Sequence, residues 1–137
     1  MNIMRRMTIF GRMVLLTFLC SACGYNTFPR DKAKGIDDPV TLKVLIDAGR
    51  TVDDGEYRIV DVRSKEKFAQ GHIPTAVNIP NGNLRQVRQT PPENRMIIVY
   101  CETGGRAQMA AQKMAKAGFN NIYNWGGFGN WTFEPEK

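Results

Sequence analysis

The sequence has few of the residues that stabilise small exported domains or bind metal ions. Its 137 residues include three cysteines and one histidine. A structural zinc site needs four ligands at close spacing. Cys20 and Cys23 belong to the amino-terminal signal segment described below, which leaves one thiol and one imidazole, so the sequence predicts no zinc site. No apolar run reaches the roughly 20 residues of a membrane-spanning helix. The positive charges, a formal net +6, do not gather in clusters with aromatic partners. The sequence therefore predicts no nucleic-acid partner.

The first 22 residues have the layout of a secretory signal peptide. Arg5, Arg6 and Arg12 form a basic region, and an apolar run follows at 13–19. This run is too short to span a bilayer as a mature helix. Residues 19–23, Leu-Cys-Ser-Ala-Cys, resemble a bacterial lipobox. An ordinary signal peptide cleaved nearby is the alternative.

The lipobox resemblance implies that Cys23 carries acyl chains and becomes the mature amino terminus. Cys20 would leave with the signal, and Cys101 would remain as the sole thiol, which excludes an internal disulfide. Polar residues up to about 37 then form a tether. The predicted organisation is a signal peptide at 1–22, a lipidated terminus and tether at 23–37, and one domain at 38–137. We expect an exported protein, held at a membrane of the bacterial cell envelope by its lipid, with a monomeric domain.

The rest of the chain alternates helix and strand patterns. Glycines, prolines and N-cap residues bound these segments. Asp38 and Pro39 are predicted to start the first helix, and Ser64 and Gly71 to cap and end the second. Short apolar strands between amphipathic helices favour an α/β fold with a mostly parallel central sheet and helices on both faces. Helices are predicted near 39–48, 65–69, 84–89 and 106–117, and strands at 57–62, 76–79, 96–100 and 121–125.

The most informative segment is the one that follows the strand at 96–100. Cys101 stands at the carboxyl end of this strand, and Gly104 and Gly105 lead into a helix. Ligands of parallel sheets bind at this edge. Loop amides and the positive end of the helix favour a thiolate, which is the nucleophilic form of cysteine. Arg106 adds a cation for an oxyanion. The segment 101–106 therefore predicts a nucleophile in an anion-binding loop, rather than an inert core cysteine.

Three separated blocks resemble the single-domain rhodaneses, sulfurtransferases that carry sulfur as a cysteine persulfide. The first block runs from Ile59 to Pro80 and includes Asp-Val-Arg at 61–63 and Gly-His-Ile-Pro at 71–74. The second, 101–106, fits the family pattern C-x-x-G-x-R. The third is Trp-Gly-Gly-Phe at 125–128. Two residues depart from the family pattern. Thr75 replaces a usual glycine, and Glu102 places a negative charge where a dianionic donor would enter.

The resemblance implies a Cys101 persulfide, formed from a donor such as thiosulfate and passed to cyanide or a thiol. The loop Glu102, Thr103, Gly104, Gly105 and Arg106 would bind the small sulfur-containing anion or thiol, and no cofactor or metal is implied. Two alternatives stay open. The first is a cysteine-dependent phosphatase or arsenate reductase, whose loop has five residues between cysteine and arginine where this chain has four. The second is a non-catalytic rhodanese-like binding module.

Five residues outside the loop are candidates for supporting roles. Asp61 and Arg63 end a strand on the Cys101 side of the sheet and are predicted to form an ion-pair network that holds the loops. His72 resembles a structural histidine of the family rather than a base. Trp125 and Trp131 are predicted to support the core and the loop.

Overall fold

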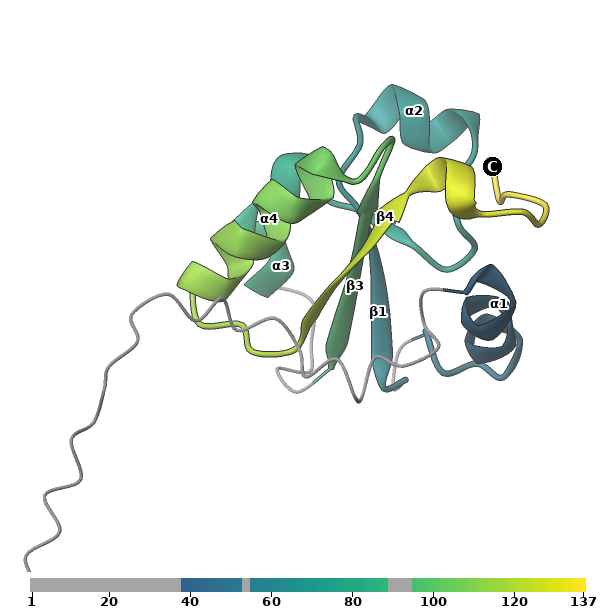
Figure 1. Ribbon diagram of the computed structural model, residues 1–137, viewed down its shortest axis with the longest axis horizontal. Helices are drawn as coiled ribbons and strands as arrows, with labels where there is room; N and C mark the ends of the chain where they lie inside the picture. The colour runs from purple at the N-terminus through teal and green to yellow at the C-terminus, as the bar shows by residue number, and fades with distance from the viewer. Residues whose placement is uncertain (1–37, 53–54, 89–94) are drawn as a thin grey trace, which may run out of the picture.

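The computed structural model describes residues 38–52, 55–88 and 95–137 (Figure 1). The predicted signal peptide and tether, with Cys20 and Cys23, lie outside the described residues. In the part of the chain that is described, no helix combines the length and hydropathy of a membrane span.

The described sheet has four parallel strands in the order β2-β1-β3-β4. The strands are β1 (Tyr57–Asp61), β2 (Val77–Asn78), β3 (Met96–Cys101) and β4 (Ile122–Gly127). The helices are α1 (Pro39–Asp47), α2 (Lys65–Gln70), α3 (Leu84–Arg88) and α4 (Gly105–Lys116), with short 3₁₀ turns η1 (Pro80–Gly82) and η2 (Phe128–Asn130).

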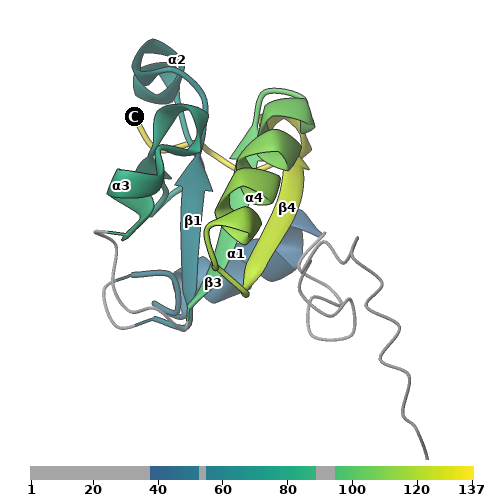
Figure 2. The ribbon, with the colours of Figure 1, turned by 90° about the vertical axis from the view of Figure 1, so that its left-hand side faces the viewer.

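Helices cover both faces of this sheet. Helices α3 and α4 lie on one face and α1 on the other, while α2 sits beyond the carboxyl ends of the strands (Figures 1 and 2). This arrangement confirms the predicted α/β fold with a mostly parallel sheet.

Local signals at the helix ends are those that the sequence predicted. The Asp38 side chain accepts a hydrogen bond from the Val40 amide, with Pro39 at the first helical position of α1. The Ser64 side chain caps α2 by accepting from the Lys67 amide, and Gly71 follows that helix. Such caps satisfy amides that a helix start leaves without partners.

Successive strand residues point to opposite faces, so the sheet carries two separate cores. The core under α1 is rich in aromatic residues. The core under α3 and α4 is aliphatic and includes Cys101. The first contains Leu42, Leu45, Ile59, Ile73, Ala76, Met96, Ile98, Tyr100, Trp125 and Trp131; the second contains Val60, Val62, Ile79, Val87, Val99, Cys101, Ala107, Ala110, Met114 and Ile122.

The last strand differs from the sequence prediction, which ended it at Trp125. Strand β4 continues through Gly126 and Gly127. The pairing register of β3 and β4 shifts at this point. Val99 pairs with Asn124, whereas the next residue, Tyr100, pairs with Gly126. Glycine has low strand propensity, which is why the pattern appeared to stop. This irregularity carries the strand up to the cysteine loop.

Candidate active site

Cys101 is the last residue of β3 and is fully buried. Its side chain belongs to the aliphatic core under α3 and α4. The Gly104 backbone N–H donates a hydrogen bond to the Cys101 Sγ atom, at an N···S distance of 3.0 Å. An amide donor on sulfur stabilises the anionic thiolate more than the neutral thiol. The sulfur is therefore held where the loop turns back over the strand end.

The loop turns directly into a helix. Gly104 is the N-cap of α4 and has φ +97°, a left-handed conformation that glycine adopts without strain. Its carbonyl accepts the Gln108 amide and so starts the helix. The first amides of α4 have no partners within the helix, and they carry its positive end. Glu102 and Thr103 are exposed at the mouth of this loop.

The backbone of strand β4 packs closely against the cysteine loop. Cys101 pairs with Gly127 in the sheet. A Cβ atom on Gly127 would lie 2.7 Å from the Glu102 carbonyl oxygen, closer than real Cβ atoms approach. A Cβ on Gly104 would lie 3.3 Å from the Gly126 Cα atom, in a tight contact. The glycines of the Trp-Gly-Gly segment thus allow the loop to close against β4.

Asn124 on β4 joins three parts of this region. Its side-chain amide donates to the Gln108 side chain on α4 at 3.0 Å and to the Gly104 carbonyl at 3.5 Å. Its side-chain oxygen accepts the Gly126 amide at 3.0 Å. One side chain therefore ties the strand, its irregular turn and the start of the helix together.

Arg106 lies in the first turn of α4 and is exposed. Its guanidinium forms no hydrogen bond or ion pair with any other described residue. The predicted loop cation is therefore at the surface with its donors available, and it does not lock the loop.

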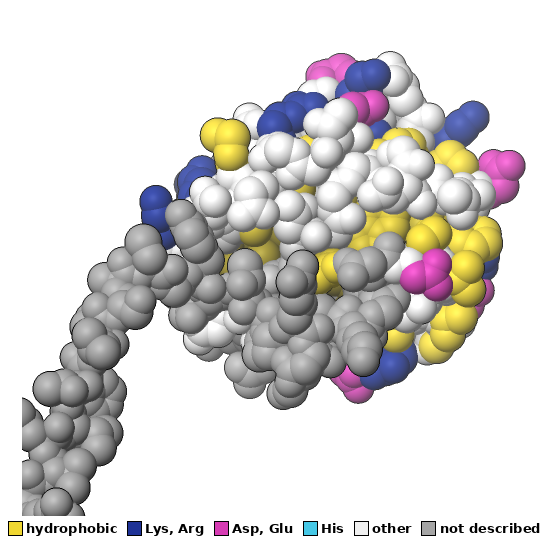
Figure 3. Space-filling view, viewed as in Figure 1, with side chains coloured by type: hydrophobic (Ala, Val, Ile, Leu, Met, Phe, Trp, Pro, Cys, Tyr) yellow, Lys and Arg dark blue, Asp and Glu magenta, His cyan; other side chains and the backbone are white. Residues whose placement is uncertain are grey.

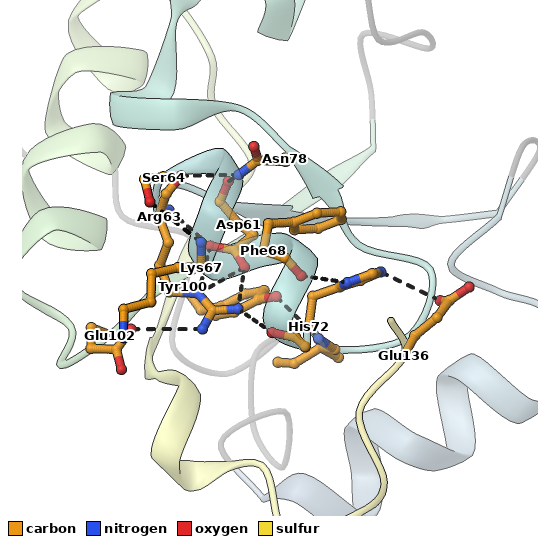
Figure 4. Close-up of polar contacts among 12 residues, drawn as sticks. Asp61, Arg63, Ser64, Lys67, Phe68, His72, Asn78, Tyr100, Glu102 and Glu136 are labelled. Carbon is orange, nitrogen blue, oxygen red and sulfur yellow. Dashed lines mark hydrogen bonds and ion pairs between the residues drawn. The ribbon is translucent and has the colours of Figure 1, made fainter.

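Asp61 and Arg63 form a buried ion pair on the opposite face of the sheet. Both Asp61 carboxylate oxygens accept from the Arg63 guanidinium, at distances from 2.7 to 3.1 Å. The same guanidinium donates to the Gly71 carbonyl at 2.7 Å and lies 4.1 Å from the Phe128 ring centroid. Figure 4 shows Arg63 at the centre of this cluster. The sequence predicted an ion pair of these residues on the Cys101 side of the sheet. The pair forms at the same edge of the sheet as Cys101, but it lies on the opposite face, beside Tyr100.

The network shifts the protonation equilibria of its members. Burial opposes the charged form of Arg63, but hydrogen bonding and attraction to Asp61 outweigh it and raise the pKa of the guanidinium. Burial, then the charge of Asp61, raises the pKa of the Tyr100 phenol. The Tyr100 oxygen also accepts the Ile73 amide at 3.1 Å. At neutral pH these groups are a charged pair beside a neutral phenol.

Glu102 links this network to the cysteine loop. Its carboxylate lies 3.6 Å from the Arg63 guanidinium, while 44% of its side chain remains exposed. The negative charge that the sequence places beside Cys101 is therefore partly compensated by a buried cation. Arg63 is shared with Asp61, so the compensation is incomplete.

His72 is directed away from the loop. Its Nδ1 lies 3.0 Å from the Phe68 carbonyl, its ring stacks on Phe68, and its Nε2 lies 3.7 Å from Glu136 (Figure 4). Its backbone also pairs with that of Glu136 in an antiparallel bridge. His72 thus fastens the C-terminal segment, in agreement with the structural role expected from the sequence.

Thr75 has φ +65°, a conformation that explains glycine at this place in the family pattern. Its hydroxyl donates to the buried Thr51 hydroxyl at 2.8 Å, and its amide donates to Glu136 at 3.1 Å. These bonds hold a residue whose backbone is strained. No group of three or more His, Cys, Asp or Glu residues that could hold a metal ion occurs among the described residues.

Gly127 and Asn124 belong to the surroundings of the loop, although the sequence pattern did not indicate a role for them at the site. A signal for Gly127 was present, because paired glycines inside a strand pattern mark an irregular pairing or a close backbone approach. Asn124 had no such signal, since its partners come from segments that only the fold brings together.

Comparison with known proteins agrees with this geometry. A family model described as a rhodanese-like domain matches residues 41–134. The thiosulfate sulfurtransferase GlpE of Shewanella oneidensis is 37% identical over 75 residues, which cover 54% of this chain and 74% of that protein. The Bacillus subtilis protein YrkF is also 37% identical, over 84 residues that cover 61% of this chain. The matched residues make up only 45% of YrkF, so this chain spans less than half of the length of that relative.

Solved structures give the same result for the fold. A rhodanese with anions from E. coli is 28% identical, with a TM-score of 0.54 over 59% of this chain and 98% of that one. The Alr3790 protein from Anabaena is 25% identical, with a TM-score of 0.63 over 72% of this chain and 80% of its own. With its fold, its cysteine loop and its family model in agreement, the chain belongs to the rhodanese-like domain family.

Proposed function

We propose that this protein is a sulfurtransferase that carries sulfane sulfur on Cys101. The observation that carries the proposal is the Gly104 amide bonded to the Cys101 sulfur, in a loop that ends at the amino terminus of a helix. This environment suits a sulfur atom that is negatively charged both before and after it receives a second sulfur.

The proposed reaction has two steps. The Cys101 thiolate attacks the outer sulfur of a donor such as thiosulfate, and the S–S bond of the donor breaks. Sulfite leaves with the bonding electron pair, and a persulfide remains on Cys101. An acceptor nucleophile, cyanide or a thiolate, then attacks the outer sulfur and releases the Cys101 thiolate. Covalent catalysis thus divides one transfer into two steps, and no organic cofactor takes part.

The loop residues have distinct roles in this proposal. The amides of 102–106 stabilise the thiolate and the persulfide anion, as an oxyanion hole stabilises developing charge. Arg106, exposed and without a partner among the described residues, orients the anionic end of the donor. Asp61 and Arg63 act from the other face of the sheet by fixing the loops that surround the site.

The alternatives are a phosphatase or arsenate reductase and a binding module. Four residues separate Cys101 from Arg106, one fewer than in the phosphate-binding loops, so the ring is narrower than a tetrahedral oxyanion needs. A module without chemistry has no use for a buried cysteine with an amide directed at its sulfur. Both observations favour sulfur transfer.

Turnover assays distinguish the three functions. The purified protein and Cys101→Ser are each given thiosulfate with cyanide, and separately p-nitrophenyl phosphate. We expect thiocyanate from the parent protein alone and nitrophenol from neither. Cysteine-dependent release of nitrophenol would favour the phosphatase. No product from either substrate pair, or from other sulfane donors, would favour the module.

A further inference from the structure

A groove lies between α3 and α4, on the face of the sheet that holds Cys101. It encloses about 420 Å³ and is lined by Leu84, Met109, Gln112, Lys113, Lys116 and Ala117. Met109 is 70% exposed, which is unusual for a large apolar side chain within a helix. The groove thus combines an apolar floor and edge with lysines along its rim.

The described helices α3 and α4 carry charge of one sign, and the exposed carboxylate of Glu102 lies outside them, in the cysteine loop. Helices α3 and α4 contain no Asp or Glu, whereas Arg85, Arg88, Arg106, Lys113 and Lys116 are all exposed on them. In Figure 3, Lys and Arg side chains and an exposed apolar side chain lie over α4, and the acidic side chains lie elsewhere. Such a surface attracts partners of negative charge.

The groove and the cysteine loop share one helix. Gly105 begins α4 at the loop, and Met109 follows it by one helical turn, about 6 Å along the axis. Lys116 lies at the far end, roughly 16 Å from Gly105. A segment lying along α4 would therefore extend from the groove to the mouth of the loop.

The shape of the surface favours a protein over a membrane. A membrane surface is flat and binds protruding apolar side chains. Here Leu84 and Ala117 are half-buried and line a groove beside the exposed Met109, so the surface fits an apolar side chain that a partner inserts. We propose that the α3–α4 groove docks an acidic protein segment that exchanges sulfur with Cys101. This inference rests on the proposed sulfur transfer for the exchange step, but docking itself does not depend on it.

Binding is tested with the full chain and a synthetic peptide. The probe is a short fluorescent peptide of Glu and Ala with a single Leu, and the matched probe has Gln at every Glu. We expect only the acidic probe to bind, and to bind more weakly as salt screens the lysines. Lys113→Gln/Lys116→Gln should weaken binding about fivefold at low salt. The control Lys43→Gln/Lys137→Gln removes the same charge away from the groove and should change binding less than about twofold.

Met109→Ala tests the apolar part of the groove separately. This substitution keeps the helix and all charges. We therefore expect it to weaken binding of the acidic peptide, and we expect that loss to persist at high salt. Equal binding of the acidic and Gln probes, or equal loss in the groove and control variants, would overturn the proposal. So would charge-dependent binding to vesicles of anionic lipid, lost in the groove variant, together with no binding of the acidic peptide.

The exchange step is measured with the same peptide carrying a terminal cysteine as sulfur acceptor. The groove variant should lower kcat/KM for this peptide about fivefold and leave cyanide as acceptor unchanged. An equal loss with cyanide would contradict the docking role. Absence of any persulfide on Cys101 would instead contradict the proposed function, while the binding result with the cysteine-free probe would still stand.

Discussion

Tyr100 and Cys101 are neighbours on β3, yet their side chains lie on opposite faces of the sheet in different environments. On the Tyr100 face, interactions of buried side chains stabilise the fold. They are the Asp61–Arg63 ion pair and the hydrogen bond that the Ile73 amide donates to the Tyr100 phenol. On the Cys101 face, backbone holds the loop: the Gly104 amide on the sulfur, and β4 packed against the loop at Gly127. Side-chain charge stabilises the first face, and backbone geometry shapes the loop around Cys101 on the second.

Arg63→Ala should have the largest effect, because it leaves the Asp61 carboxylate buried without its cation. We expect the free energy of unfolding to fall by about 3–5 kcal/mol, measured by urea denaturation. Lys43→Ala, which breaks an exposed pair with Asp47 in one helix, should cost only about 0.5 kcal/mol. Similar losses in the two variants would show that the buried pair does not support the Tyr100 face.

Gly127→Ala tests the backbone side of the comparison. The new Cβ would meet the Glu102 carbonyl, so the loop must move away from β4. We expect a loss of stability of about 1–3 kcal/mol and a fall in sulfur transfer of about tenfold or more. Gly129→Ala, where no atom lies within 4 Å of the new Cβ, is the matched control. Unchanged transfer by Gly127→Ala would contradict the role given to β4.

Alkaline pH should destabilise the protein through Tyr100. The folded state raises the pKa of this phenol above its unfolded value of about 10, so the unfolded chain releases the proton first. The neutral Tyr100 phenol makes its full contribution to the free energy of unfolding below about pH 10. This contribution falls by about 1.4 kcal/mol per pH unit as the pH rises further. Chemical denaturation at a series of pH values measures this slope. Tyr100→Phe should remove it, and an equal slope in that variant would assign the effect elsewhere.

Glu102→Gln should have the smallest effect, since Arg63 already compensates part of the charge. We expect the initial rate with thiosulfate to rise about twofold at low ionic strength, with the gain disappearing as salt screens the charge. Glu66→Gln on α2 serves as the control. A slower rate with Glu102→Gln would mean that the carboxylate helps the donor or the loop.

The two faces also differ in how well the sequence predicts them. The helix caps at Asp38 and Ser64, the alternation of buried strand residues and the cysteine at a strand end were all visible in the sequence, because each depends on neighbouring residues. The Asp61–Arg63 ion pair could also be predicted, because the two residues are only two positions apart in the sequence. The contact of Gly127 with Glu102 could not be predicted, because it depends on a register shift between β3 and β4. The bond of Asn124 to Gln108 could not be predicted either, because it joins β4 to α4, which are separate in the sequence. Thr75 was noted as a departure, but its positive φ and its bond to Thr51 required the fold.

The intact mass of the protein after exposure to thiosulfate tests the central claim most directly. We predict a gain of one sulfur atom, reversed by cyanide and absent from Cys101→Ser. Cys20 and Cys23 are present in both chains, so an adduct on either would appear in both and is thereby distinguished. A gain in Cys101→Ser equal to that of the parent protein, or no gain with thiosulfate or any other sulfane donor, would contradict a persulfide carried by Cys101.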